Sequence, residues 1–156
     1  MIIHFICRGN TYRSRLAEAY LNSKQSTTLK SISSGIVASK NGNGPISWYA
    51  QRIIENEKLV PFESPGWQQT TKEIIERADF TIFMQQDSCD YCRERLGFTQ
   101  NNYEIWDIKD MGEFLFSSIG MRPATEMEKI KVSEETFESI KGKIDDLINR
   151  FSKIIK

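Results

Sequence analysis

The stretch from Ile2 to Arg15, IIHFICRGNTYRSR, decides the fold that the sequence predicts. A short apolar run ends at Cys7, and Arg13 and Ser14 follow before apolar residues begin to recur at helical spacing. This order is typical of a buried strand, a tight loop and the first turn of a helix. The stretch therefore predicts a strand–loop–helix unit with Cys7 at the end of the strand.

The loop after this strand has the residue types of an anion site. A loop that leads into a helix N-terminus can direct several backbone N–H groups to one point, where the helix dipole also favours negative charge. Gly9 allows the backbone to curl, Asn10 tolerates left-handed geometry, and the planar guanidinium of Arg13 can hold two phosphate oxygens. Such an electropositive setting favours the thiolate form of Cys7, which would be a nucleophile aimed at phosphorus.

The segment Cys7–Ser14, CRGNTYRS, resembles the Cys-x5-Arg-Ser phosphate loop of the low-molecular-weight protein tyrosine phosphatases. The family usually continues with a proline and an Ala-Glu pair, and this chain has Arg15 in place of the proline. The resemblance implies that Cys7 is the nucleophile and that Ser14 steadies its thiolate. The phosphate-binding residues that it implies are Arg8, Gly9, Asn10, Thr11, Tyr12, Arg13 and Ser14.

Length and composition fit one globular domain. The chain has 156 residues, enough to bury a core, and its 21 basic and 21 acidic side chains give a formal net charge of zero. This balance argues against a general nucleic-acid binder. The first apolar run is too short for a signal peptide or a membrane span. A nucleophilic thiol needs reducing surroundings, so we expect a cytoplasmic protein that acts away from membranes.

Strands and helices are predicted to alternate along the chain. Further strands are expected at 29–34, 79–84 and 103–106, and helices at 15–24, 46–57, from Thr70 or Thr71 to Arg77, and 86–96, with a flexible loop at 41–45. Alternation implies right-handed crossovers and hence a parallel sheet. We therefore predict a single α/β domain over residues 1–156, with a four-stranded parallel sheet flanked by helices on both faces and the phosphate loop after the first strand. Ligands of such sheets bind beyond the carboxyl ends of the strands, where Cys7 lies.

The last helix is predicted to pack on one face of the sheet. Ser133 can cap its start, and Glu134 and Glu135 suit a first turn. Its apolar positions recur at helical spacing at Phe137, Ile140, Ile144, Leu147, Ile148, Phe151 and Ile155.

Aromatic residues near the start of the helix at 46–57 allow two interpretations. Trp48 is a candidate core position together with Ile53 and Ile54. In the family that the phosphate loop resembles, an aromatic near this place forms a wall of the cleft, which implies that role for Trp48 or Tyr49.

A second motif follows the fourth predicted strand. The segment Trp106–Met111, WDIKDM, resembles the family's Asp-Ile-Pro-Asp-Pro, in which the second aspartate is the general acid. The resemblance implies that Asp110 is the proton donor and that Asp107 supports the loop. Lys109 and Met111 stand where the family has prolines, and two solvated loop aspartates are the alternative.

The family's pair of tyrosines beyond this aspartate is missing. We interpret residues from about 111 to 132 as an atypical insert. A loop of this length is usually functional, ordered by its own packing, or disordered. Our hypothesis is that the segment forms a lid or wall beside the cleft and replaces the missing tyrosines.

Cys89 and Cys92 have the spacing of a metal half-site or a redox pair. Zinc would need two more soft ligands, and only His4 and Cys7 remain, so we expect no metal. Thioredoxin-coupled arsenate reductases share this loop and fold and use two further cysteines, but their first relay cysteine would fall at Met84. Ordinary helix cysteines are the simpler interpretation, and we expect His4 to be a satisfied core histidine.

The function that the sequence predicts is a cysteine-dependent phosphatase. It would hydrolyse a phosphotyrosine protein or a small aryl phosphate through a phosphocysteine, with Cys7, Arg13 and Asp110 as catalytic residues and no cofactor. Arg8 and Arg15 would lie near the rim, either attracting anionic substrates or simply solvated. The alternatives are an arsenate reductase and a catalytically weak phosphate- or phosphopeptide-binding module. The sequence leaves the oligomeric state open.

Overall fold

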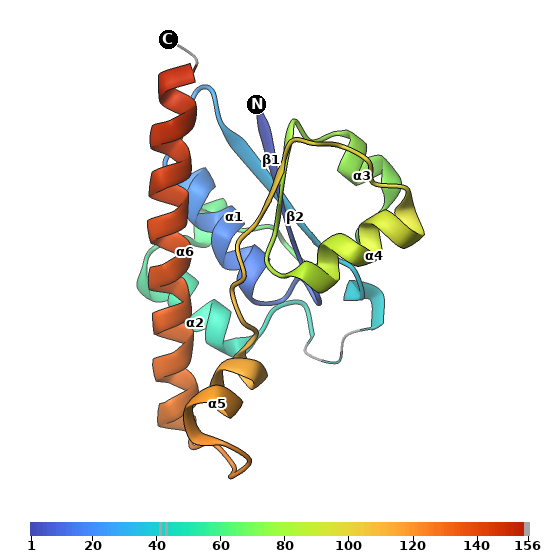
Figure 1. Ribbon diagram of the computed structural model, residues 1–156. Helices are drawn as coiled ribbons and strands as arrows, with labels where there is room; N and C mark the ends of the chain where they lie inside the picture. Colours follow the sequence, from blue (N-terminus) through green and yellow to red (C-terminus); the bar gives the residue numbers. More distant parts are fainter. Residues whose placement is uncertain (41, 43, 155–156) are drawn as a thin grey trace.

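The computed structural model describes residues 1–40, 42 and 44–154. A parallel sheet lies at the centre of the fold, between the helices (Figure 1). The strands run in the order β2-β1-β3-β4, all of them parallel. Their bounds are β1 Ile2–Cys7, β2 Lys30–Gly35, β3 Phe80–Phe83 and β4 Tyr103–Ile105. The chain moves from β1 to one side for β2 and to the other side for β3, so the end of β1 lies at a topological switch point, where parallel sheets bind ligands.

Helices cover both faces of the sheet, as the sequence predicted. In Figure 1, α3 and α4 lie on one side of the strands, whereas α1, α2 and α6 lie on the other. The bounds of these helices are α1 Arg13–Ser23, α2 Trp48–Asn56, α3 Lys72–Glu76, α4 Gln86–Leu96 and α6 Glu126–Ile154. A further helix, α5 Met111–Ile119, follows β4. The short 3₁₀ turns are η1 Ala38–Lys40 and η2 Val60–Phe62. No helix in the described part of the chain is both long and apolar enough to cross a membrane.

The central strand β1 is buried on both sides. Ile3 and Phe5 belong to the larger core, which includes Leu16 of α1, whereas Ile6 belongs to a smaller core with Phe83. Successive side chains of a strand point to opposite faces, so a strand covered on both faces needs a continuous apolar run. The run at the start of the sequence, apolar except for the buried His4, reflects this position in the sheet.

Local signals at several element ends are confirmed. The Thr71 hydroxyl accepts a hydrogen bond from the N–H of Ile74 at 3.4 Å and so caps α3. Gly97 ends α4 in the left-handed conformation, with φ of 68°. The loop predicted at 41–45 and the apolar position at Ile155 include residues 41, 43 and 155, which lie outside the described residues.

The predicted start of the last helix was wrong. α6 begins at Glu126, and Ser133 is buried inside it instead of capping it. The cap is a reciprocal pair, because the Thr125 hydroxyl accepts from the N–H of Glu128 at 3.2 Å while the Glu128 carboxylate accepts from the N–H of Thr125 at 2.9 Å. The segment from 111 to 132 is therefore no single long loop: it consists of α5, a turn at Gly120 and the first turns of α6.

Candidate active site

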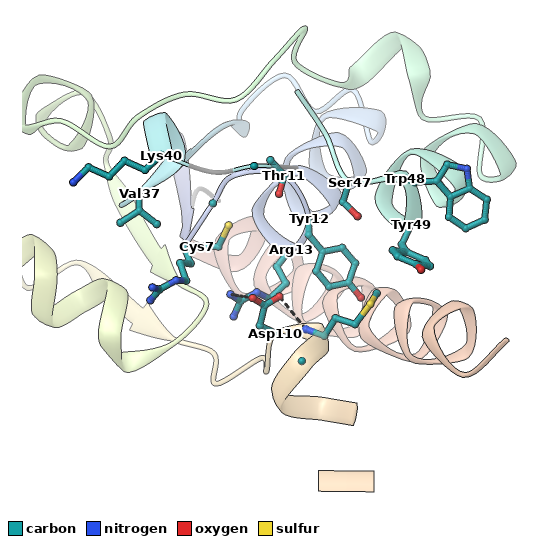
Figure 2. A pocket seen from close by; sticks show the side chains of 15 residues that line it. Cys7, Thr11, Tyr12, Arg13, Val37, Lys40, Ser47, Trp48, Tyr49 and Asp110 are labelled. Atoms are coloured by element: carbon teal, nitrogen blue, oxygen red, sulfur yellow. Dashed lines mark hydrogen bonds and ion pairs between the residues drawn. The ribbon is translucent and has the colours of Figure 1, made fainter. Parts of the chain in front are cut away.

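Cys7 opens into a cleft of about 770 Å³ at the carboxyl end of β1 (Figure 2). The phosphate loop forms its floor, with Arg8, Gly9, Thr11, Tyr12 and Arg13 among the lining residues. The segment that follows β4 and the start of α2 supply the walls. The structure thus brings the two sequence motifs, which are about 100 residues apart, to one place.

The Cys7 sulfur is surrounded by hydrogen-bonding groups of its own loop. The Ser14 hydroxyl lies 2.9 Å from Sγ, and the backbone N–H of Asn10 donates to Sγ at 3.2 Å. Asn10 has φ of 54°, the left-handed geometry that the sequence suggested, and its Nδ2 donates to the Ser14 hydroxyl at 2.8 Å. Because the Ser14 oxygen accepts from the Asn10 amide, the Ser14 hydroxyl proton is left to point at the sulfur. A hydrogen bond donated to the sulfur stabilises its thiolate form.

Gly35 at the end of β2 lies against the underside of this loop. A Cβ at this position would come within 2.6 Å of the Asn10 nitrogen and 2.7 Å of the Gly9 carbonyl carbon. The loop is also tied to the chain beyond β2, because the N–H of Val37 donates to the Arg8 carbonyl at 2.9 Å. The absence of a side chain at position 35 therefore allows the loop to keep its shape.

Arg13 is buried and held from one edge. Its Nη1 donates to the side-chain oxygen of Gln85 at 2.6 Å and to the carbonyl of Ile108 at 2.8 Å. Its Nη2 lies 3.7 Å from a carboxylate oxygen of Asp110, and its buried Nε has no hydrogen-bond partner among the described residues. Nε and Nη2 together form the opposite edge of the guanidinium, which has the geometry to hold two oxygens of an oxyanion.

Gln85 is a site residue that sequence reasoning missed. It lies two residues beyond the end of the parallel strand β3, so it is at the same edge of the sheet as Cys7. Its side chain accepts from Arg13 and donates through Nε2 to Glu113 of α5 at 2.8 Å. A polar residue directly after a central buried strand was the available signal.

Asp110 lies in the cleft at the start of α5. One carboxylate oxygen accepts from the N–H of Met111 at 2.9 Å and caps the helix, and the side chain is 43% exposed. Asp107, the other aspartate of the motif, has a left-handed backbone with φ of 52° and lines a separate cavity behind the loop. Of the two aspartates, Asp110 is the one that the structure places beside Cys7 and Arg13.

Trp48 and Tyr49 line the opposite side of the cleft from Lys40 and Val37 (Figure 2). Trp48 is 60% exposed, so the interpretation of this residue as core was wrong. Its ring packs edge-to-face on Tyr49 with the centroids 5.1 Å apart, and the Tyr49 hydroxyl donates to Glu126 at 2.5 Å. This contact fixes the two aromatic rings at the mouth of the cleft.

Arg15 lies in the interior, which corrects its predicted place near the rim. Its guanidinium donates to the carbonyls of Pro45 at 3.0 Å, Asn10 at 3.4 Å and Ser64. Burial and the nearby Glu18 act in opposite directions on the pKa of Arg15, and burial, the larger effect, lowers it. Arg15 therefore joins the phosphate loop to two distant loops. Arg8, by contrast, is exposed and lies 3.8 Å from Asp87.

Cys89 and Cys92 are not among the residues that line the cleft. Both are fully buried in the smaller core, in contact with the same cluster as Phe83 and Phe98. Burial raises the pKa of the Cys92 thiol to about 12, which opposes thiolate formation. Within the described ranges, the structure has no group of three or more His, Cys, Asp or Glu side chains arranged to hold a metal ion.

His4 is only half satisfied in the core. Its Nε2 lies 2.7 Å from the Ser34 hydroxyl, but its Nδ1 has no hydrogen-bond partner in the described part of the chain. Burial, with a smaller effect of Arg77, lowers the pKa of His4 to about 3. The ring is therefore neutral in the folded protein and is a structural group.

The fold and the cysteine–arginine loop define a class of phosphatase, and comparison with known proteins gives its family. The model of the family described as "Low molecular weight phosphotyrosine protein phosphatase" matches residues 2–156. The chain belongs to this family and is a phosphatase enzyme with a cysteine nucleophile.

Individual relatives carry different activities. An arsenate reductase of Oceanobacillus iheyensis is 27% identical over 152 residues, which cover 97% of this chain and 95% of that protein. A low-molecular-weight protein tyrosine phosphatase from T. tengcongensis has a similar structure, with a TM-score of 0.75, 22% identity, and coverage of 96% of this chain and 99% of that one. The YwlE arginine phosphatase from Geobacillus stearothermophilus gives a TM-score of 0.73 at 23% identity and covers 97% and 93%.

Proposed function

We propose that this enzyme hydrolyses phosphotyrosine or a similar aryl phosphate through a phosphocysteine intermediate. The observation that carries the proposal is the arrangement of Cys7, Ser14 and Arg13. The sulfur accepts hydrogen bonds inside the loop, and Arg13, whose Nε and Nη2 make no hydrogen bond among the described residues, lines the same cleft. A nucleophile beside a fixed cation can attack phosphorus while the cation stabilises charge on the equatorial oxygens.

The first chemical step transfers the phosphoryl group to sulfur. The Cys7 thiolate attacks phosphorus and forms the S–P bond, while the bond from phosphorus to the leaving oxygen breaks and its electron pair stays on that oxygen. Asp110, on the wall of the cleft, gives this oxygen a proton and becomes a carboxylate. Arg13 holds two equatorial oxygens throughout, so the phosphoryl group passes from the leaving oxygen to the Cys7 sulfur with little displacement.

The second step returns the enzyme to its starting state. The Asp110 carboxylate takes a proton from a water molecule, whose oxygen attacks phosphorus as the S–P bond breaks. Inorganic phosphate leaves, and Cys7 is again a thiolate that accepts the Ser14 hydrogen bond.

Turnover of p-nitrophenyl phosphate tests the proposal. We expect Cys7→Ser to abolish turnover, because the serine hydroxyl is a far weaker nucleophile. Cys89→Ala is the matched control, and it should keep most of the activity once thermal melting shows that it is folded. Loss of turnover in Cys89→Ala but not in Cys7→Ser would refute the assignment of the nucleophile.

The substrate class needs a panel, because a solved neighbour is an arginine phosphatase. Peptides carrying phosphotyrosine, phosphoserine or phosphoarginine at the same position would be compared by kcat/KM. We expect phosphotyrosine to be preferred, because the exposed Trp48 and the half-buried Tyr49 can pack against an aromatic leaving group. Preference for phosphoarginine would mean that the enzyme hydrolyses a phosphorus–nitrogen bond instead of an aryl phosphate ester.

Arsenate reduction is the second candidate, because a relative over almost the full chain is an arsenate reductase. That chemistry needs further thiols that exchange with Cys7, and thiolates are the reactive species. Cys89 and Cys92 are both fully buried in the smaller core, and Met84 is buried too. Arsenate-dependent oxidation of thioredoxin, abolished by Cys89→Ala, would establish this candidate; we expect none.

A further inference from the structure

α5 is an apolar helix that the fold covers only in part, since Met111 packs against the larger core whereas Phe116 is exposed. Five of its nine residues are Met, Phe, Leu or Ile, yet none of the nine is buried. Phe116 is 62% exposed, although a phenylalanine is ordinarily among the more buried residue types. Such an exposed apolar surface beside a cleft is typical of an interaction site.

The two faces of α5 serve different neighbours. Phe114, Ser117 and Ser118 line a small cavity together with Thr136 of α6, so this face is turned toward α6. Met111 and Gly112 line the catalytic cleft instead. Because residues three and four apart lie on one face of a helix, Leu115, Phe116 and Ile119 continue the face that begins at Met111 and Gly112. We call Met111, Leu115, Phe116 and Ile119 the α5 stripe.

The α5 stripe is continuous with the cleft. It starts inside the cleft at Met111 and runs outward along the helix, and Phe116 lies one turn beyond Gly112. One turn is about 6 Å of helix, the length of about two residues of extended chain. A bound polypeptide that leaves the cleft beside Gly112 would therefore reach Phe116 after about two further residues.

The side of the cleft opposite to Trp48 and Tyr49 carries a cationic side chain. Lys40 lines that side together with Val37, whereas Trp48 and Tyr49 give the other side an aromatic surface (Figure 2). A small aryl phosphate would occupy only the floor and the nearest ring. A polypeptide can cover both sides of the mouth at once, and its phosphate fixes it in place.

From this arrangement we propose that the substrate is a phosphorylated polypeptide with a large apolar residue two positions from the phosphorylated one, and that this residue packs on the α5 stripe at Phe116. The proposal rests on the proposed function of the cleft and names the substrate class that the same site selects. The occupant is a polypeptide because its chain extends from the phosphorylated residue in the cleft and can reach Phe116, four residues along α5 from Gly112 of the cleft wall.

Two phosphotyrosine peptides test this proposal, one with leucine two positions on each side of the phosphotyrosine and one with serine at both places. We expect the wild-type enzyme to prefer the leucine peptide about tenfold in kcat/KM, as burial of one apolar side chain allows. Phe116→Ser should remove this preference, and Phe116→Leu should keep most of it. Ile154→Ser, at an exposed apolar residue at the far end of α6, should leave the preference unchanged.

Turnover of p-nitrophenyl phosphate separates this test from that of the proposed function. If the wild-type enzyme does not turn over this compound, the proposed function fails, and the preference would then be measured as peptide affinity of Cys7→Ser by fluorescence anisotropy. Equal kcat/KM or equal affinity for the two peptides, or a preference that survives Phe116→Ser, overturns the proposal. Sedimentation that shows a dimer lost in Phe116→Ser would assign the stripe to a second copy and overturn it as well.

Discussion

The Nη2 of Arg13 and the Oδ2 of Asp110 lie 3.7 Å apart across the cleft. The group that would hold the phosphate and the group that would protonate the leaving oxygen therefore face each other. The separation exceeds a hydrogen bond, so oxygens of a bound phosphate could contact Arg13 while the leaving oxygen points at Asp110. This relationship distinguishes Asp110 from Asp107, which lines a different cavity.

Replacing Asp110 by asparagine should lower kcat for phenyl phosphate about 100-fold, because the amide cannot donate the proton that the phenolate needs. For p-nitrophenyl phosphate, whose leaving group needs less help, the loss should be smaller. Asparagine also serves as a helix cap, so α5 should keep its start and the melting temperature should stay near the wild-type value.

Asp107→Asn is the matched control for this measurement. Asparagine tolerates the left-handed backbone that Asp107 adopts, so the fold should be unaffected. We expect kcat within twofold of wild type for both substrates. A loss confined to Asp107→Asn would transfer the acid role to that residue.

Gln85→Met should weaken catalysis by loosening Arg13. The substitution keeps the length of the side chain but removes the oxygen that accepts from Nη1, and the carbonyl of Ile108 alone then holds that edge. We expect kcat/KM to fall about tenfold, as misplacement of a phosphate-binding group typically allows. Gln86→Met is the control, since the Gln86 side chain donates to Asp90 on the surface of α4. Equal effects of the two substitutions would contradict a positioning role for Gln85.

Gly35→Ala should distort the phosphate loop, because the added Cβ would lie 2.6 Å from the backbone nitrogen of Asn10. The N–H of Asn10 also donates to the Cys7 sulfur, so the same shift disturbs the nucleophile. We expect kcat for p-nitrophenyl phosphate to fall at least tenfold. Gly66→Ala, where a Cβ would meet nothing within 4 Å, should keep full activity.

The sequence was sufficient for the sheet and the phosphate loop, because both depend on local signals. Apolar runs bounded by turn residues located the strands within about two residues, and the run from Cys7 to Ser14 placed Cys7 at the end of the first strand. Gly97 and Thr71 ended or began helices as their usual capping roles predict. Where one short segment determines the geometry, the sequence alone can be interpreted.

Features that depend on distant segments could not be obtained in this way. Arg15 occupies a first-turn helix position where charged residues are usually solvated, and its burial depends on the carbonyls of Pro45 and Ser64. The start of α6 was missed because Ser133, followed by two glutamates, imitates a cap, whereas the true capping pair at Thr125 and Glu128 precedes a weakly periodic turn. Competing signals of equal local strength are resolved only by packing.

Arg15→Met should destabilise the fold by about 3 kcal/mol, because it removes a buried charge that satisfies three carbonyls and leaves Glu18 without its cation. Arg15→Lys should recover little, since one ammonium lacks the planar fork that reaches separate acceptors. Urea denaturation measures the change. Arg8→Met, at an exposed position, should cost less than about 0.5 kcal/mol. A comparable loss in both methionine variants would mean that the carbonyl contacts contribute nothing.

His4 should make the fold sensitive to acid. Its pKa is lowered to about 3 by burial and, to a smaller extent, by Arg77, whereas in the unfolded chain it returns to about 6.5. Between these two values the unfolded state binds the additional proton, so the free energy of unfolding falls as the pH is lowered, by up to about 1.4 kcal/mol per pH unit. Glu18, whose pKa is raised by burial above its ordinary value of 4.5, acts in the opposite direction from about pH 4.5 upward.

The difference between wild type and His4→Gln isolates the contribution of the histidine, because Glu18 is common to both proteins. Glutamine can replace the hydrogen bond to the Ser34 hydroxyl and carries no titrating proton. Urea denaturation at several pH values from 4 to 8 should show the two curves parallel above pH 7 and diverging below it, with wild type losing stability faster. Curves that remain parallel down to pH 4 would mean that the folded protein accepts the proton on His4. The inference that the buried ring is neutral would then be wrong.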